Sequence, residues 1–225
     1  MRILLKPFTS ITTLILIMMV VACAAKTVPY PLPPKKPVTQ KLAGQDLQKF
    51  SGNYRACMTA LNKANIDYTP IPDRVSPKGC ELKDQITLDR SRYPYSAPVI
   101  GTCEIIAAVA AWEEQVVRKN ALKFLGEDIK EITHYAMFSC RNIAGTSKRS
   151  EHSKGNAIDI AGFTMKNGDK IMVLDHWKDR GKKGQFLRTV FKDSCKIFKG
   201  AMGPNSNAAH RDHFHFDMGS WGFCD

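Results

Sequence analysis

The stretch SEHSKGNAID, residues 150–159, is the part of this chain that best defines its fold. It places His152 and Asp159 seven residues apart, with Gly155 between them. Glycine adopts backbone conformations that other residues avoid, so Gly155 predicts a turn. Ala157, Asp159 and Ala161 are spaced two residues apart, which predicts a β-strand with these three side chains on one face. We therefore expect a loop histidine to fold back beside a strand aspartate.

A second cluster, HRDHFH at residues 210–215, contains three of the six histidines of the chain. Alternation predicts a strand over 211–217, in which His213, His215 and Asp217 share a face. Two imidazoles and one carboxylate leave a fourth position for water, as a catalytic zinc ion requires. A histidine network without metal and a non-haem iron site are the alternatives. Iron sites of that kind usually take a histidine and a carboxylate two residues apart, which does not fit the first stretch.

The remaining pattern predicts an α+β domain with a small antiparallel sheet and helices packed on it. The strongest helix covers residues 103–125, with Thr102 as its N-cap and Gly126 at its end. Other helices are expected over 47–65 and 185–198, and strands over 132–138, 157–161 and 171–174.

The N-terminus predicts export. Arg2 and Lys6 precede an apolar run over residues 11–21, about half of the roughly 20 residues that span a bilayer, so residues 1–22 are interpreted as a signal peptide. An uncleaved membrane anchor is the alternative. The small residues before Cys23 resemble a lipobox, which implies lipidation of this thiol and, because Ala24 follows, an outer-membrane lipoprotein facing the periplasm. Residues 23–45 form a proline-rich linker, and residues 46–225 form the domain.

The other cysteines agree with export. An even number in a secreted domain predicts disulfides, and the absence of C-x-x-C spacing argues against a cysteine metal cluster. Free buried thiols are the alternative. The candidates are Cys57, Cys80, Cys103, Cys140, Cys195 and Cys224.

The net charge of +12 favours an anionic partner. The lysines are scattered rather than clustered with stacking aromatic residues, so we expect no nucleic acid. Behind a signal peptide, the expected partners are peptidoglycan and, through the lipid anchor, the membrane. The sequence does not indicate an oligomeric state.

The pattern Ser-x-His-x-x-Gly-x-Ala-x-Asp, followed by His-x-His, resembles the LAS group of zinc metallopeptidases, whose fold sonic hedgehog shares. More specifically, the chain resembles the bacterial extensin-like C-terminal domain family over nearly all of residues 50–225. The matching positions are Cys57, Cys103, Ala107, Trp112, residues 139–141, 150–163, 203–205 and 207–215, and Cys224.

This resemblance implies roles for individual residues. His152, Asp159 and His215 match the ligands of one zinc ion per chain. Asp212 occupies the position of a general base in D-Ala-D-Ala peptidases, and His213 matches a histidine that helps activation in endopeptidases. Which of these two takes the proton stays open.

Two further residues are candidates for the active site. His210 matches another active-site histidine of murein endopeptidases. Arg141 is a candidate for holding an oxyanion or a substrate carboxylate, with a surface salt bridge as its alternative. Asp217 is expected to fix an imidazole tautomer. His134 and His176 lie in no motif, and we interpret both as structural.

Two functions fit these expectations. The first is a zinc-dependent peptidase or amidase that cuts peptidoglycan stem peptides or cross-links. The alternative is a non-catalytic lipoprotein in which zinc stabilises a structural or peptidoglycan-binding domain. The fold alone does not separate them, because both share it.

Overall fold

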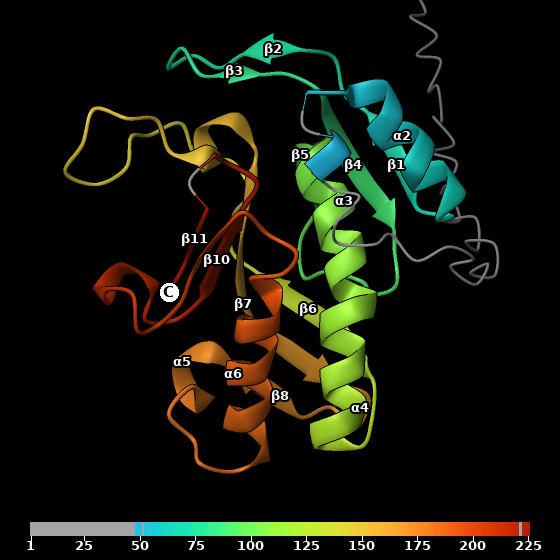
Figure 1. Ribbon diagram of the computed structural model, residues 1–225, viewed down its shortest axis with the longest axis vertical. Coiled ribbons are helices and arrows are strands. Elements are labelled where there is room, and N and C mark those ends of the chain that lie inside the picture. The colour runs from blue at the N-terminus through green and yellow to red at the C-terminus, as the bar shows by residue number, and fades with distance from the viewer. Residues whose placement is uncertain (1–47, 51, 221) are drawn as a thin grey trace, which may run out of the picture. The chain divides into compact units, whose positions relative to one another are not determined.

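The computed structural model describes residues 48–50, 52–220 and 222–225 (Figure 1). The expected signal peptide, Cys23 and the linker therefore lie outside the described residues. Within the described part, no helix has both the length and the apolar character needed to cross a bilayer.

The main sheet is mostly antiparallel, as the alternating segments predict. Its strand order is β11-β9-β10-β7-β6, with β8 paired to β7, and only the β11–β9 pair is parallel. The strands are β6 (Ile129–His134), β7 (Ala157–Met165), β8 (Lys170–Met172), β9 (Gly200–Met202), β10 (Phe214–Asp217) and β11 (Phe223–Cys224).

Aromatic side chains join one face of this sheet to the helices. Trp112, at the end of α3 (Cys103–Trp112), contacts Phe163 of β7 and Phe216 of β10. Phe186 of α6 (Lys182–Ser194) packs edge-on against Phe163 at 5.2 Å. Strand alternation then turns the odd-numbered residues of β10 to the opposite face, away from this aromatic core.

A bulge in β7 reverses its side-chain alternation. His134 of β6 pairs with Ile160 and Thr133 pairs with Gly162, so Ala161 is the extra residue. Such a bulge changes the direction in which the following side chains point. It lets Phe163 enter the aromatic core although Asp159, four residues earlier, serves the other face.

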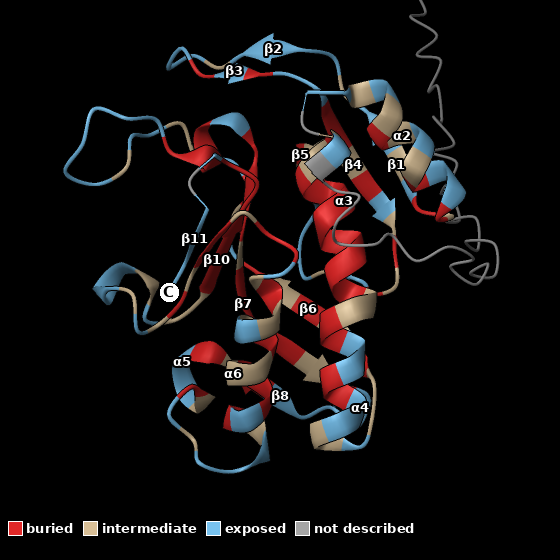
Figure 2. Cartoon of the chain, viewed as in Figure 1, coloured by how far each residue is buried: buried red, intermediate tan, exposed pale blue. Residues whose placement is uncertain are grey.

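The predicted helix over 103–125 is confirmed. The Thr102 side chain accepts a hydrogen bond from the Ile105 N–H, and Gly126 ends the helix with a φ of 78°. A π-helical turn, Glu113–Arg118, divides it into α3 and α4 (Lys119–Leu125). Nearly all of α3 is buried (Figure 2).

A second sheet precedes this helix and was not predicted. Its order is β1-β4-β5, and a separate β2–β3 hairpin projects from it (Figure 1). Prolines and short strand lengths hide these elements in the sequence. The strands are β1 (Asp67–Pro70), β2 (Arg74–Val75), β3 (Glu81–Leu82), β4 (Gln85–Arg90) and β5 (Val99–Thr102). The helices before them are η1 (Gln48–Phe50) and α2 (Tyr54–Lys63), and α2 corresponds to the helix predicted over 47–65.

Several predicted boundaries are wrong. The first helix begins at residue 54 rather than 47, and α6 covers 182–194 rather than 185–198. β6 ends at His134, because the chain then leaves the strand to contact the loop of His152. The predicted strand over 171–174 is split between β8 and the short helix α5 (Val173–His176). Only Phe214–Asp217 of the predicted strand over 211–217 is extended, because η4 (Ala208–His210) and a turn precede it.

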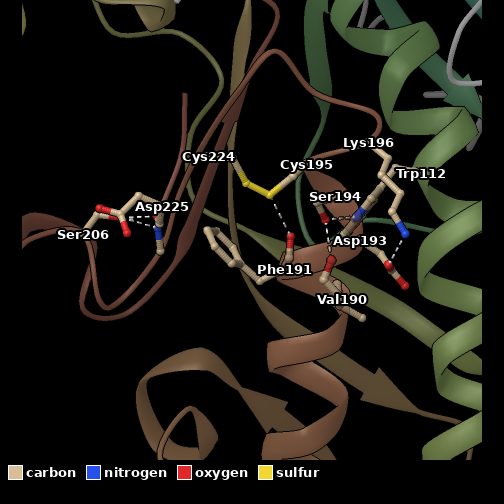
Figure 3. The surroundings of a disulfide bond; sticks show 11 residues. Trp112, Val190, Phe191, Asp193, Ser194, Cys195, Lys196, Ser206, Cys224 and Asp225 are labelled. Atoms are coloured by element: carbon tan, nitrogen blue, oxygen red, sulfur yellow. Dashed lines mark hydrogen bonds and ion pairs between the residues drawn. A yellow bond between two sulfur atoms is a disulfide. The ribbon is translucent and has the colours of Figure 1, made fainter. Parts of the chain in front are cut away.

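All six cysteines of the domain form disulfides, as predicted. Cys57–Cys103 joins α2 to α3, and Cys80–Cys140 joins the β2–β3 hairpin to the segment before His152. Cys195–Cys224 joins the end of α6 to β11 (Figure 3). One of the three bonds, Cys80–Cys140, therefore anchors the segment that precedes His152.

Candidate metal centre

His152, Asp159 and His215 meet at one point, as the sequence predicts. His215 on β10 lies directly opposite Asp159 on β7 in the strand register. His152 comes from the short helix η3 (Glu151–Lys154), which ends at Gly155 with a φ of 65°. Its Nε2 lies 3.0 Å from His215 Nδ1 and 3.1 Å from Asp159 Oδ1, and the latter two atoms are also 3.1 Å apart.

Each of the two imidazoles has a hydrogen-bond partner on the side away from the cluster, and this partner orients the ring. His152 Nδ1 lies 3.1 Å from the Met137 carbonyl oxygen, which can only accept, so Nδ1 carries the proton and Nε2 a lone pair. His215 Nε2 lies 3.0 Å from Asp217 Oδ2 and donates to it, which leaves the lone pair on Nδ1. Three acceptors therefore point at one another, and a cation would satisfy all three at once.

The spacing of these atoms suits zinc. Zinc lies about 2.0–2.1 Å from imidazole nitrogen and carboxylate oxygen, so tetrahedral ligand atoms are about 3.3 Å apart. The observed separations of 3.0–3.1 Å need only a small expansion. The donor set of two imidazoles and one carboxylate also leaves a fourth position.

Without a metal, the cluster favours an additional proton on His215. Burial lowers the pKa of His215, but the hydrogen bonds and charges of Asp159 and Asp217 outweigh it and raise the pKa to about 9. Burial also raises the pKa of Asp159, yet its bonds to the two imidazoles hold that pKa well below its ordinary value. The site thus stabilises positive charge among its ligands.

Asp217 is held firmly behind His215. Its Oδ1 accepts the Gly219 N–H at 2.8 Å, and its Oδ2 accepts from His215. A side chain at Gly200 would collide with this carboxylate, so glycine is required there. The expected role of Asp217 in fixing an imidazole tautomer agrees with these contacts.

Asp212 and His213 form a pair at the edge of the site. His213 Nδ1 lies 2.9 Å from Asp212 Oδ1, and the hydrogen bond lowers the pKa of Asp212. His213 Nε2 faces Asp159 Oδ1 at 3.6 Å. Because Nδ1 donates to Asp212, Nε2 is the lone-pair nitrogen of the neutral ring, and it is the nitrogen that faces Asp159.

His210 also lies beside the cluster. Its ring is 5.2 Å from that of His213 and 5.7 Å from that of His215. Burial, and then the neighbouring imidazoles, lower the pKa of His210 to about 4. The positive charge of Arg141, an exposed residue whose Nη1 lies 3.5 Å from the Asn142 carbonyl oxygen, adds to this effect.

Some contributors were missed. The Met137 carbonyl is a backbone atom, which side-chain patterns in a sequence do not reveal. Asn207, whose Oδ1 accepts from His210 Nδ1, lies in the matching stretch 207–215 but was assigned no role. The ring of Tyr135 lies edge-on to His213 at 5.9 Å, although no spacing rule indicated it. His134 and His176 instead contact the backbone of Ala97 and Met172, outside the cluster.

The geometry defines a disulfide-stabilised α+β domain with a histidine–aspartate cluster that could hold a metal ion. The model of a family described as extensin-like protein C-terminus matches residues 55–225, and the chain belongs to this family. No curated protein and no solved structure matches the chain.

Proposed function

We propose that this domain is a zinc-dependent peptidase or amidase that cuts peptidoglycan stem peptides or cross-links. The observation that carries the proposal is the convergence of three lone pairs, from His152, Asp159 and His215, beside a third imidazole, that of His213. This arrangement matches the resemblance of the sequence to LAS-type zinc peptidases with a hedgehog-like fold.

Each residue has a defined task in this proposal. His152, Asp159 and His215 would hold the zinc ion, which supplies Lewis acidity that acidifies water and polarises an amide carbonyl. His213 Nε2 accepts the proton from the attacking water and returns it to the leaving amine. Asp212 positions His213 and stabilises its charged form through the 2.9 Å hydrogen bond. The geometry thus favours His213 over Asp212 as the base.

His210 and Arg141 suit the binding of substrate. The low pKa of His210 keeps its imidazole neutral at neutral pH, so it adds no charge beside the metal ligands. Arg141 is exposed nearby and always charged. It is suited to pair with a carboxylate of the stem peptide.

The proposed location is the cell envelope. The N-terminal sequence predicts a signal peptide and lipidation at Cys23. Three disulfides are typical of an oxidising compartment such as the periplasm. Loss of Arg2 and Lys6 with the signal peptide would lower the net charge from +12 to +10, and the resulting outer-membrane lipoprotein would reach the anionic wall polymer across its proline-rich linker.

The direct test is digestion of isolated sacculi by the purified, zinc-loaded full chain. We expect soluble peptidoglycan fragments, with release abolished by a chelator and restored by zinc. His213→Ala should lower the rate by about 10²–10⁴-fold with the zinc content unchanged. Asp169→Asn, which replaces an exposed acidic residue outside the site, is the control. Release that a chelator leaves unaffected would refute the proposal.

One observation favours the non-catalytic alternative. The ligand side chains are only 2% exposed at His152, 14% at Asp159 and 7% at His215. Structural zinc sites are closed, whereas catalytic sites keep an open position. If the zinc-loaded chain binds sacculi without releasing fragments, and if His213→Ala changes nothing, the structural or binding function is correct.

A further inference from the structure

The segment 135–137 supports two of the three candidate ligands with backbone atoms alone. The Tyr135 N–H donates to the Asp159 carbonyl at 2.9 Å, and the Asp159 N–H donates to the Ala136 carbonyl at 3.2 Å. The Met137 carbonyl accepts from His152 Nδ1 at 3.1 Å. These backbone hydrogen bonds therefore hold the segment beside the two candidate ligands.

The side chain of Tyr135 is not used for this support. It is 52% exposed, and its ring meets His213 edge-on at 5.9 Å. Phe138, one residue beyond Met137, is 39% exposed, and the next residue, Ser139, donates its N–H to the His152 carbonyl. Two large apolar side chains are thus exposed within four residues of chain that border the centre.

Exposed aromatic residues cost hydration free energy unless a partner covers them. Of the exposed large apolar residues that the structure describes, only Tyr135 and Phe138 lie within four residues of each other, whereas Val75, Leu122, Leu174 and Phe223 are isolated in the sequence. The exposure at the edge of the metal centre is therefore informative about ligand binding. A ring beside a reactive site provides a rigid surface for a ligand at low entropic cost.

We propose that Tyr135, together with Phe138, forms the surface that binds peptidoglycan beside the metal centre. This inference rests on the proposed function and names the residues that position its substrate. The flat ring faces pack against the apolar faces of the amino sugars, and the hydroxyl of the exposed Tyr135 side chain bonds the sugar or peptide groups. The polymer is thereby held with one amide close to His213.

Binding can be measured without cleavage. In a His213→Ala background, the zinc-loaded full chain should sediment with isolated sacculi. Tyr135→Ala should weaken this binding by about tenfold, Phe138→Ala by less, and Tyr135→Phe by about threefold or less. Phe223→Ala is the control, since Phe223 is 47% exposed on β11, two strands away from His215. All variants should keep the parental zinc content, because only backbone atoms of this segment contact the ligands.

The outcomes separate this inference from the proposed function. Unchanged binding by Tyr135→Ala overturns the inference, even if the wild-type chain cleaves sacculi. Equal loss with Phe223→Ala, or loss of zinc in Tyr135→Ala, also overturns it. If the wild-type chain cleaves nothing while Tyr135→Ala loses binding, the binding surface stands and the hydrolase proposal fails.

Discussion

Individual residues orient the two imidazoles of the candidate metal centre. The Met137 carbonyl and the Asp217 carboxylate each accept the outer N–H of one imidazole, so both inner nitrogens face the centre of the cluster. Such outer partners raise the basicity of a ligand and fix its orientation. Metal affinity should therefore depend on residues that never contact the metal.

Asp217→Asn tests this dependence. An amide at this position places an N–H₂ group or a weaker acceptor against His215 Nε2, so the correct tautomer loses its stabilisation. We expect zinc affinity to fall by about 10–100-fold, as measured by competition with a fluorescent chelator. Asp169→Asn should keep the wild-type affinity. Equal affinity in both variants would show that Asp217 does not orient His215.

Asp212→Asn tests whether Asp212 acts only through His213 or is itself the base. If Asp212 acts only through His213, its loss should lower the rate of fragment release by about tenfold, less than His213→Ala does. Initial rates measured across a pH series for both variants provide the comparison. A greater loss with Asp212→Asn would make Asp212 the base.

At the scale of single elements, the π-helical turn places Glu113 in a buried pocket. The Glu113 carboxylate accepts hydrogen bonds from Ser91, from Tyr95 and from the Arg92 backbone N–H. Burial raises its pKa from 4.5 to about 7, although these bonds oppose the shift. Because the folded-state pKa is the higher one, this group favours folding below pH 4.5, and its contribution is lost as the pH rises through 7.

Glu113→Gln should remove this pH dependence. Relative to the wild type, the unfolding free energy of the variant should rise by about 1–3 kcal/mol between about pH 5 and about pH 8. Urea denaturation at several pH values measures the difference. A constant difference across this range would mean that Glu113 does not change its charge on folding in the expected way.

The disulfide between α2 and α3 is the second test at this scale. Cys57 and Cys103 are only 1% and 2% exposed, whereas Cys224 of the C-terminal disulfide is exposed. Replacing both Cys57 and Cys103 with alanine should lower the unfolding free energy by about 2–5 kcal/mol. The Cys195→Ala, Cys224→Ala variant should lose less in the same denaturation experiment. An equal or larger loss there would contradict this ranking.

Local elements near the site were more predictable than distant ones. The loop of His152 and the strand of Asp159 can be predicted from residues 150–159 alone, because Gly155 indicates the turn and the alternating side chains that follow indicate the strand. The bulge at Ala161 and the β1-β4-β5 sheet depend on contacts between segments far apart in sequence. Alternation predicted a last strand that begins too early, at residue 211. His213 in fact precedes β10, and its ring still faces Asp159.

At the scale of the described domain, one face of the sheet packs into the core and the opposite face carries the candidate metal centre. Phe214 and Phe216 of β10 pack into the aromatic core with α3 and α6, while His215 and Asp217 occupy the opposite face. The sequence predicted the α+β class and the paired cysteines. It did not predict which cysteines pair, since six cysteines allow about 15 connectivities.

The central claim is that His152, Asp159 and His215 bind one zinc ion. Elemental analysis of the purified full chain after dialysis tests it most directly. The account predicts one zinc ion per wild-type chain and almost none in a His215→Ala variant that remains folded by circular dichroism. A wild-type chain without metal, or a folded His215→Ala chain that retains a full equivalent of zinc, would contradict it.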